Sequence, residues 1–445
     1  MGVRPENSLL ESESDHTFVV LGMTLTEESA SGVGGVGTPA VSSVIVQLHL
    51  RSATLVAAAM MVMNVVTYGF NLVAARMLIP AEFGAVTALL SIILVANVVS
   101  LGLQATIARK LSVAPLERRA AIIGAASRVT WSVSAAVGAV VACSTVVMTP
   151  LLRLDSPVPV LLCGAMIVPL TVMGAQAGVA QGTERWHKLS AIYLGNGFGR
   201  LVGGCTGILL LPSAAGAMLG LAVGAWLPVI AGLGLLRIRG EHDDIRLLLT
   251  ETAGSAFALL SYFVLSNADA LIARNLFDPH DSGLYAAGLI LTKATLFLPQ
   301  FVSVVLFPTL SRDESHRSRM LAAGAVTLLG ICVIGGTLVL PQLALALVGG
   351  PQYSEISGRL WLFALSGSFL ALAHMLVFDA LARRSKGATV LIWAALALVV
   401  ALAYTLDVGI TGLVLIVAGC SGGLCVVLLA LPLLTERRSA PARTP

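Results

Sequence analysis

Two basic residues, Lys293 and Arg200, lie deep inside long apolar stretches of the sequence. Lys293 is the only charged residue among the thirty between Asp281 and Arg312. Each cation stands about ten residues inside its stretch, roughly 15 Å from either end at 1.5 Å per residue. A basic residue at the centre of a membrane helix costs roughly 2.5–3.5 kcal/mol and normally faces the interior of a helix bundle or a hydrated cavity. Two deep cations without a deep acid predict an interior that binds an anion, such as phosphate or pyrophosphate. The alternative is that each cation pairs with a buried acid or with the carbonyls of a helix C-terminus.

Other polar side chains recur on one face of two apolar segments. They are Asn64, Tyr68 and Asn71 in the first segment and Tyr262, Ser266 and Asp269 in the second. At helical spacing each set lies on a single face, and we expect the two faces to line a shared hydrated cavity. Interhelical hydrogen bonding is the alternative. For Asp269 we expect a structural pair with Arg274, whereas a proton or cation site is the alternative.

The elements that hold these residues are membrane-spanning helices. The chain is 57% hydrophobic and only 11% charged, against about 25% charged residues in soluble domains, and its mean hydropathy is +0.92. Apolar runs of about 20 residues, long enough to cross a bilayer as helices, recur along the chain. The predicted fold is therefore an all-α polytopic membrane protein with about twelve spans. The predicted spans are 53–75, 85–107, 129–150, 158–180, 189–211, 214–236, 252–273, 284–307, 320–347, 360–382, 388–406 and 409–434.

The basic residues of the loops predict the orientation of the chain. Twenty-one Arg and Lys residues fall in the tails and in alternate loops, whereas the other loops hold only four, Arg76, Arg153, Arg274 and Arg359. Basic residues concentrate on the cytoplasmic side of membrane proteins. Both termini are therefore predicted to be cytoplasmic, and the four arginines lie on the opposite, outer side.

An internal repeat divides the chain. "ARMLIPAEFG" begins at Ala75 and "ARNLFDPHDSG" at Ala273, and the glycines that close them, Gly84 and Gly283, each precede a Leu-Ser pair by the same distance. The offset between the copies is 198 residues before the loop and 199 after it. Two six-helix bundles related by a pseudo-two-fold axis along the membrane normal are predicted. The predicted domains are a disordered cytoplasmic tail (1–50), the two bundles (51–240 and 241–435) and a cytoplasmic tail (436–445).

Motifs for soluble catalysis are missing from the sequence. It has no Walker A lysine, H-E-x-x-H or G-x-S-x-G pattern, and its six cysteines fall in apolar runs without metal-ligand spacing. An intramembrane glycosyltransferase is disfavoured because the outer loops carry acids singly or in one loose pair. We therefore expect no catalytic residue, no cofactor, no metal site and no nucleic-acid partner.

Two blocks of sequence resemble a known family. "AARMLIPAEFGAVTALLSIILVANVVSLGLQATIARKLS" (74–112) contains the pattern A-R-x-L-x-P-x-E-F-G. "NADALIARNLFDPHDSGLYAAGLILTKATLFLPQFVSVVLFPTLSR" (267–312) contains an Asp, a Gly-x-Tyr entry, the basic Lys293 and F-P-x-L-S-R. Both blocks resemble the polysaccharide transport branch, the flippases of O-antigen and other lipid-linked oligosaccharides, of the multidrug/oligosaccharidyl-lipid/polysaccharide exporter superfamily.

The resemblance implies a central cavity lined by cations and alternating access that moves an undecaprenyl-pyrophosphate-linked oligosaccharide from the inner to the outer leaflet of a bacterial cytoplasmic membrane. It places Lys293 and Arg200 where such proteins carry cavity cations, with Arg76 and Arg274 at the gate and loop positions. The implied partners are the lipid-linked glycan, membrane lipids, and a glycan polymerase or glycosyltransferases of the same pathway. Replacing Lys293 with alanine is expected to impair transport without preventing insertion.

Two rival functions remain open. A cation-coupled multidrug exporter of the same superfamily would require Asp269 and tolerate loss of Lys293. A non-transporting scaffold of a glycan assembly complex would permit normal glycan export after deletion of the spans with the tails retained.

Overall fold

The chain forms two groups of helices. The computed structural model describes residues 39–236, 259–296, 316–382 and 386–439, the short segments 18–20 and 23–25, and positions 250, 252 and 257. The first group contains α1 (Pro39–Met77), α2 (Pro80–Ala96), α3 (Val98–Val113), α4 (Leu116–Cys143), α5 (Thr145–Leu151), α6 (Val158–Gly182), α7 (Trp186–Leu210), α8 (Ala214–Gly224) and α9 (Trp226–Ala231). The second contains α11 (Ala268–Leu276), α12 (Pro279–Thr295), α14 (His316–Val339), α15 (Pro341–Val348), the 3-10 helix η2 (Pro351–Arg359), α16 (Leu360–Ala382), α17 (Lys386–Thr405) and α18 (Ile410–Ser439).

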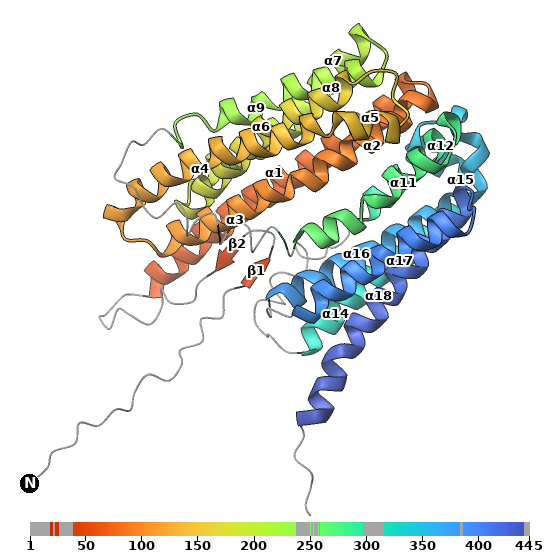
Figure 1. Ribbon diagram of the computed structural model, residues 1–445. Helices are drawn as coiled ribbons and strands as arrows, with labels where there is room; N and C mark the ends of the chain where they lie inside the picture. The colour runs from red at the N-terminus through yellow and green to blue at the C-terminus, as the bar shows by residue number, and fades with distance from the viewer. Residues whose placement is uncertain are drawn as a thin grey trace, which may run out of the picture.

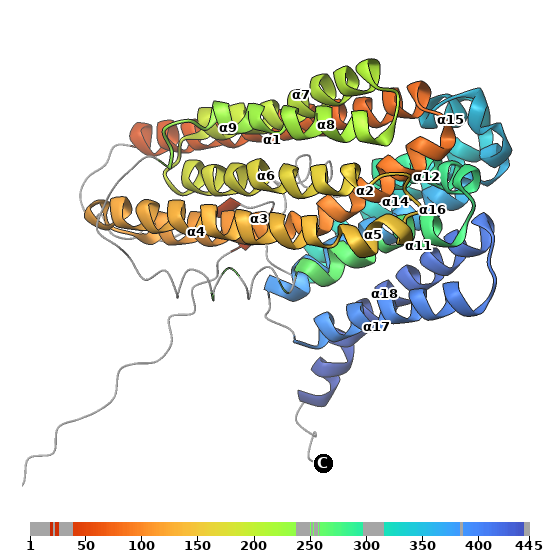
Figure 2. The same ribbon diagram turned by 45° about the horizontal axis from the view of Figure 1, so that its top comes forward.

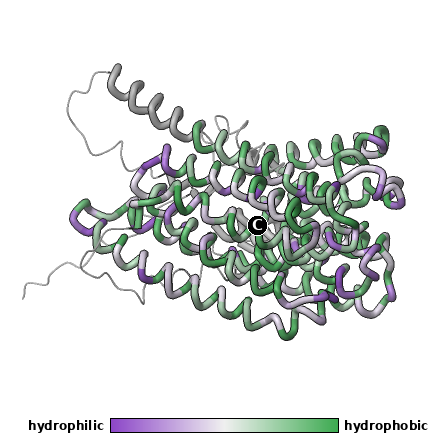
Figure 3. Tube along the Cα trace, turned by 90° about the horizontal axis from the view of Figure 1, so that it is seen from above, coloured by the Kyte–Doolittle hydropathy of each residue, from purple (hydrophilic) through white to green (hydrophobic). Residues whose placement is uncertain are grey.

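The prediction of a helical polytopic membrane protein is confirmed. Among the described residues, eight helices are long and apolar enough to cross a membrane, or nine when the bent pair α14 and α15 counts as one span. Hydrophilic residues gather mostly near the ends of the helices, and apolar residues cover their length (Figure 3). Parts of the seventh and eighth predicted spans, including Pro299 and the F-P-x-L-S-R motif, lie outside the described residues.

The structure differs from the predicted tails at both ends. Helix α1 begins at Pro39, so residues 39–50 are helical, because a proline suits the first turn of a helix and the apolar run that follows it continues into the first span. Residues Phe18–Val20 (β1) and Met23–Leu25 (β2) pair as antiparallel strands. At the other end, α18 continues to Ser439, beyond the predicted boundary at 435.

Two predicted spans are broken where a proline disturbs the helix. Helix α8 ends at Gly224, four residues before Pro228, whose ring conflicts with the carbonyl one turn earlier. The ninth span, predicted as one segment (320–347), is instead α14 followed by α15 at an angle of 103°. This break falls at Leu340, immediately before Pro341, because the residue before a proline is disfavoured in the helical region.

Close packing between α7 and α8 depends on glycine. A Cβ added to Gly220 would lie 2.0 Å from the carbonyl oxygen of Gly203, and one added to Gly203 would lie 2.4 Å from that of Gly220. Glycines at four-residue spacing let two membrane helices approach in this way. The arrangement fixes α7, and with it Arg200, against the rest of the first half.

Replacing Gly220 with leucine is therefore expected to destabilise the first half by about 1–3 kcal/mol, the usual cost of overpacking. The midpoint of thermal unfolding in detergent should fall by several degrees. The matched control is Gly419→Leu in α18, because a Cβ at Gly419 meets nothing within 4 Å. Equal midpoints for the two variants would contradict the packing described.

The two halves meet at one end of the molecule. Helix α2 packs against α11 and α12, and α1 packs against α12 and α15. The helices of the two halves diverge from this end toward the opposite one (Figures 1 and 2). Following the orientation predicted from the loop charges, we call the end where the halves meet the outer end and the opposite one the inner end.

Candidate functional site

Lys293 lies on α12, and its side chain contacts the residues where the seventh span is broken. Its Nζ donates to the carbonyl oxygen of Ser266 at 2.5 Å and to Oδ1 of Asn267 at 2.9 Å. Ser266 and Asn267 form the turn that separates α11 from the helical residues before it, and the last carbonyls of a helix lack partners within it. The partly buried lysine therefore caps a helix C-terminus in this conformation. Binding to such carbonyls was the alternative to anion binding in the sequence analysis.

Asp269 lies near Lys293 but does not form an ion pair with it. Its Oδ2 accepts a hydrogen bond from the Tyr285 hydroxyl at 3.3 Å, and its Oδ1 accepts one from the backbone N–H of Ala270 at 2.9 Å. Asp269 is only 2% exposed. The predicted structural pair with Arg274 is not formed either, because the Arg274 guanidinium binds backbone carbonyls.

Arg200 lies on the face of α7 that packs against α1. On the same face, Asn196 donates to the sulfur of Met63 at 3.5 Å, and Gly204 packs against the ring of Phe70. Arg200 itself is partly exposed. Among the residues that the structure describes, its guanidinium has no hydrogen-bond or ion-pair partner. A partly exposed, unpartnered guanidinium at mid-depth can bind an anion through paired N–H donors.

The polar faces predicted to line a cavity differ between the halves. Asn64, Tyr68 and Asn71 on α1 are partly exposed, but the Tyr68 hydroxyl donates to the carbonyl oxygen of Leu347 in the other half at 2.7 Å. Tyr262 and Ser266 are buried. Tyr262 donates to the carbonyl oxygen of Leu370 at 3.0 Å, and its ring packs edge-on against His374 on α16. Tyr262 therefore packs against α16 within the second half, and its place in a cavity stays a prediction.

Arginines connect the two halves at the outer end. Arg274, 6% exposed, donates to the carbonyl oxygens of Leu152 at 2.9 Å and Ala81 at 3.0 Å. Its equivalent in the repeat, the exposed Arg76, donates to the carbonyl oxygen of Ala346 at 2.8 Å. Arg153, which was not among the predicted site residues, donates to the carbonyl oxygen of Phe277 at 2.9 Å. The sequence could have pointed to it, because it is one of only four arginines in the outer loops.

Two of these arginines, Arg76 and Arg153, place their side chains on helix C-termini of the other half. Ala346 is near the end of α15, and Phe277 follows α11 directly. The hydroxyl of Tyr353 and the amide of Gln352 similarly donate to the carbonyl oxygen of Ala75, near the end of α1. Because such carbonyls carry the negative end of the helix dipole, cations and hydroxyls from the opposite half stabilise the closed outer end.

The two glycines of the repeat pack against each other's segments at the outer end. A Cβ added to Gly283 would lie 2.0 Å from the carbonyl oxygen of Pro80, and one added to Gly84 would lie 2.8 Å from Oγ of Ser282. The ring of Phe83 packs edge-on against Tyr353, with centroids 6.2 Å apart. The start of α2 therefore crosses the start of α12 at a distance that only glycine permits.

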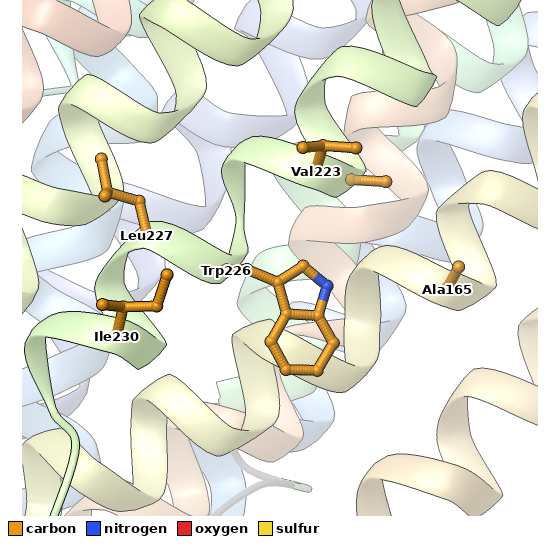
Figure 4. Close-up of a pocket in the computed structure, with 6 residues that line it drawn as sticks. Ala165, Val223, Trp226, Leu227 and Ile230 are labelled. Atoms are coloured by element: carbon orange, nitrogen blue, oxygen red, sulfur yellow. The ribbon is translucent and has the colours of Figure 1, made fainter.

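An apolar groove lies within the first half, where α8 and α9 meet near α6 (Figure 4). Its volume is about 420 Å³. The residues that line it are Ala165, Ala222, Val223, Trp226, Leu227 and Ile230. No charged side chain lines this groove, so it is not the site for an anion. Within the described residues, no cluster of His, Cys, Asp and Glu could hold a metal ion.

The fold of the chain is similar to the folds of several solved membrane transporters. A multidrug resistance MATE family transporter of the MOP superfamily, in its inward-facing conformation, is 11% identical; the match covers 85% of this chain and 96% of that one, with a TM-score of 0.67. The lipid II flippase MurJ, in an inward closed conformation, is 10% identical over 85% of this chain and 87% of that one, with a TM-score of 0.70. A MOP superfamily transporter from Pyrococcus furiosus, described as having a binding pocket of reversed polarity, is 14% identical over 86% and 95%, with a TM-score of 0.53.

These similarities show that the chain has the fold of the exporter superfamily to which the two sequence blocks pointed. No curated protein sequence matches the chain significantly. The family model described as "Polysaccharide biosynthesis protein" matches residues 49–313, which is more than half of the chain and includes both sequence blocks together with Arg200 and Lys293. The chain is a member of the polysaccharide biosynthesis protein family with the MOP-superfamily fold.

Proposed function

We propose that this protein is a flippase that moves an anionic polyprenyl-pyrophosphate-linked oligosaccharide from the inner to the outer leaflet by alternating access. The observation that carries the proposal is the guanidinium of Arg200, which is held at mid-depth without a partner among the described residues. A fixed cation in a low-dielectric interior attracts an anion strongly. The polysaccharide biosynthesis family supports a glycan as the substrate, and the transporter fold supports movement across the membrane.

Lys293 has a second role in the proposal. Its Nζ already binds two neutral acceptors, Ser266 O and Asn267 Oδ1. A phosphate oxygen accepts a stronger, charge-assisted hydrogen bond than a carbonyl does, so the pyrophosphate competes successfully for the ammonium group. Arg200 provides the first binding contact, and Lys293 joins it at the cost of its present partners.

The closed outer end supports the proposed direction of transport. With the halves held together by Arg76, Arg153 and Arg274 at the outer end, the substrate enters between the diverging inner ends. We place the protein in the bacterial cytoplasmic membrane with both termini in the cytoplasm, as the loop charges predict. The lipid-linked glycan arrives from glycosyltransferases on the inner side and leaves to a polymerase on the outer side.

A cation-coupled drug exporter is the second candidate, and Asp269 is the residue that favours it. This carboxyl is buried, and its partners among the described residues are a hydroxyl and a backbone N–H, so that it can accept a proton or a cation. An exporter of lipophilic cations would need Asp269, whereas the flippase needs Arg200.

Ligand-dependent thermal unfolding distinguishes the two candidates. A ligand at 100 times its dissociation constant stabilises a protein by about 2.7 kcal/mol, so a polyprenyl-pyrophosphate oligosaccharide should raise the unfolding midpoint of the wild type. The uncharged polyprenol and tetraphenylphosphonium should not. The shift should disappear in Arg200→Gln and persist in the outer-loop control Arg359→Gln. Protection by tetraphenylphosphonium alone, lost in Asp269→Asn, would instead establish the drug exporter.

A further inference from the structure

Helix α11 has one end at the deep cation and the other at the outer contact between the halves. It has nine residues, Ala268–Leu276, and is therefore roughly 13 Å long at 1.5 Å per residue. Asp269, Ala270, Ile272 and Ala273 are all buried. A short helix that is packed along its length moves as one rigid element.

The inner end of α11 is fixed by Lys293. Ser266 closes the helical turn before the break, since its N–H donates to the carbonyl oxygen of Tyr262 at 2.9 Å. The Ser266 carbonyl oxygen itself accepts from Lys293 Nζ, which also binds the Asn267 side chain. This ammonium group therefore ties α12 to the residues directly before α11.

The outer end of α11 carries much of the contact with the other half. Arg274 binds Leu152 O and Ala81 O, and the Asn275 amide donates to the carbonyl oxygen of Leu151 at 2.9 Å. The carbonyl oxygen of Phe277, just after the helix, accepts from Arg153. A tilt of α11 would break these bonds together.

The first half lacks the equivalent arrangement. At the repeat offset of 199, Lys293 corresponds to Leu94. At the offset of 198, Asn267 corresponds to Gly69, which lies inside the unbroken helix α1. Among the residues that the structure describes, the exposed Arg76 has one bond to the other half, whereas its buried equivalent Arg274 has several. Both the broken helix and the cation at its break are therefore confined to the second half.

We propose that α11 couples anion binding at Lys293 to opening of the outer end. This inference rests on the proposed function, because the anion is the pyrophosphate of the lipid-linked substrate. The anion draws Nζ away from Ser266 O and Asn267 Oδ1, which frees the inner end of α11. The helix then tilts about the break, and Arg274 leaves its acceptors in the first half. The empty protein stays closed at the outer end because Lys293 holds α11 in place.

Pulsed electron paramagnetic resonance on the full chain tests this coupling. Spin labels on Pro212→Cys and Leu406→Cys, two exposed positions at the outer ends of the two halves, report the separation of the halves once the native cysteines are replaced. Without ligand, Lys293→Met should increase the outer-open population at least fivefold. The control Lys188→Met should leave it unchanged, because the partner of Lys188 among the described residues, the carbonyl oxygen of Ala231, lies within the first half. Asn267→Ala, which removes one acceptor, should give a smaller shift in the same direction.

Repeating the measurement with polyprenyl pyrophosphate distinguishes a failure of this coupling from a failure of the proposed function. Polyprenyl pyrophosphate should open the outer end of the wild type and add nothing in Lys293→Met. If the ligand-free Lys293→Met protein opens but the wild type ignores polyprenyl pyrophosphate, the coupling stands and the proposed substrate is wrong. If Lys293→Met and Asn267→Ala both unfold at the wild-type temperature and keep the wild-type distance distribution, the coupling is wrong whatever the substrate is.

Discussion

Replacing Arg200 with glutamine is expected to slow the flipping of a polyprenyl-pyrophosphate oligosaccharide by about tenfold to a hundredfold. A hydrogen bond to a charged group contributes about 1.5–3 kcal/mol, and each 1.4 kcal/mol is about a factor of ten. Glutamine keeps much of the length and polarity of arginine but removes the charge and the paired donors. Because Arg200 has no partner among the described residues, its loss leaves no buried acceptor unsatisfied there.

The measurement is leaflet accessibility of the lipid-linked glycan in proteoliposomes. The unfolding midpoint of Arg200→Gln should equal that of the wild type or exceed it, because an apolar environment is relieved of a charge. Arg359→Gln, which removes an exposed arginine outside the proposed path, should flip normally. Normal flipping by Arg200→Gln would contradict the assignment of this residue to the substrate.

Replacing Gly283 with alanine is expected to prevent the outer end from closing. The new Cβ would lie 2.0 Å from the carbonyl oxygen of Pro80, so α12 must move away from α2. Overpacking costs about 1–3 kcal/mol, which shifts the equilibrium between closed and open outer ends by about fivefold to more than a hundredfold. A transporter that does not close at this end cannot return to bind the next substrate, and flipping should fall at least tenfold.

Gly335→Ala is the matched control for this prediction. It makes the same change in α14, where a Cβ meets nothing within 4 Å. The separation of spin labels at the outer end should increase in Gly283→Ala and remain at the wild-type value in Gly335→Ala. A wild-type separation and wild-type flipping in Gly283→Ala would show that the crossing of α2 and α12 does not control closure.

The general architecture could be predicted from the sequence because membrane helices leave a local signal. Apolar runs of about 20 residues mark the spans wherever the bilayer is the solvent. The repeat was visible because Arg76 and Arg274, and Gly84 and Gly283, occupy matching positions in "ARMLIPAEFG" and "ARNLFDPHDSG". In the structure these four residues lie at the contact between the halves.

The breaks in the helices were harder to predict. Pro228 is inside a predicted span and interrupts it, whereas Pro169 lies within the continuous helix α6. Neighbouring helices decide whether the backbone groups freed by a proline find partners, and that information is not local. The break at Ser266 and Asn267 has no proline at all, so no sequence signal marked it.

The role of Lys293 could be predicted only in part. Its depth in an apolar run required a partner or a cavity. One of its two partners is the Ser266 backbone carbonyl, a group that every residue carries and no sequence pattern identifies. The contacts of Tyr262 could not be predicted for a related reason. Helical periodicity assigned it correctly to the face that also carries Ser266, but periodicity does not say whether that face meets the other half or α16 in its own half.

Leaflet accessibility of lipid-linked substrates in proteoliposomes of the wild-type protein tests the central claim most directly. A polyprenyl-pyrophosphate oligosaccharide and the matching uncharged polyprenyl oligosaccharide would be compared in the same vesicles. We expect the pyrophosphate-linked substrate to become accessible in the opposite leaflet at least tenfold faster than in protein-free vesicles, and the uncharged one to remain near the protein-free rate. Equal rates for the two substrates, or no acceleration of either, would contradict an anion-selective flippase.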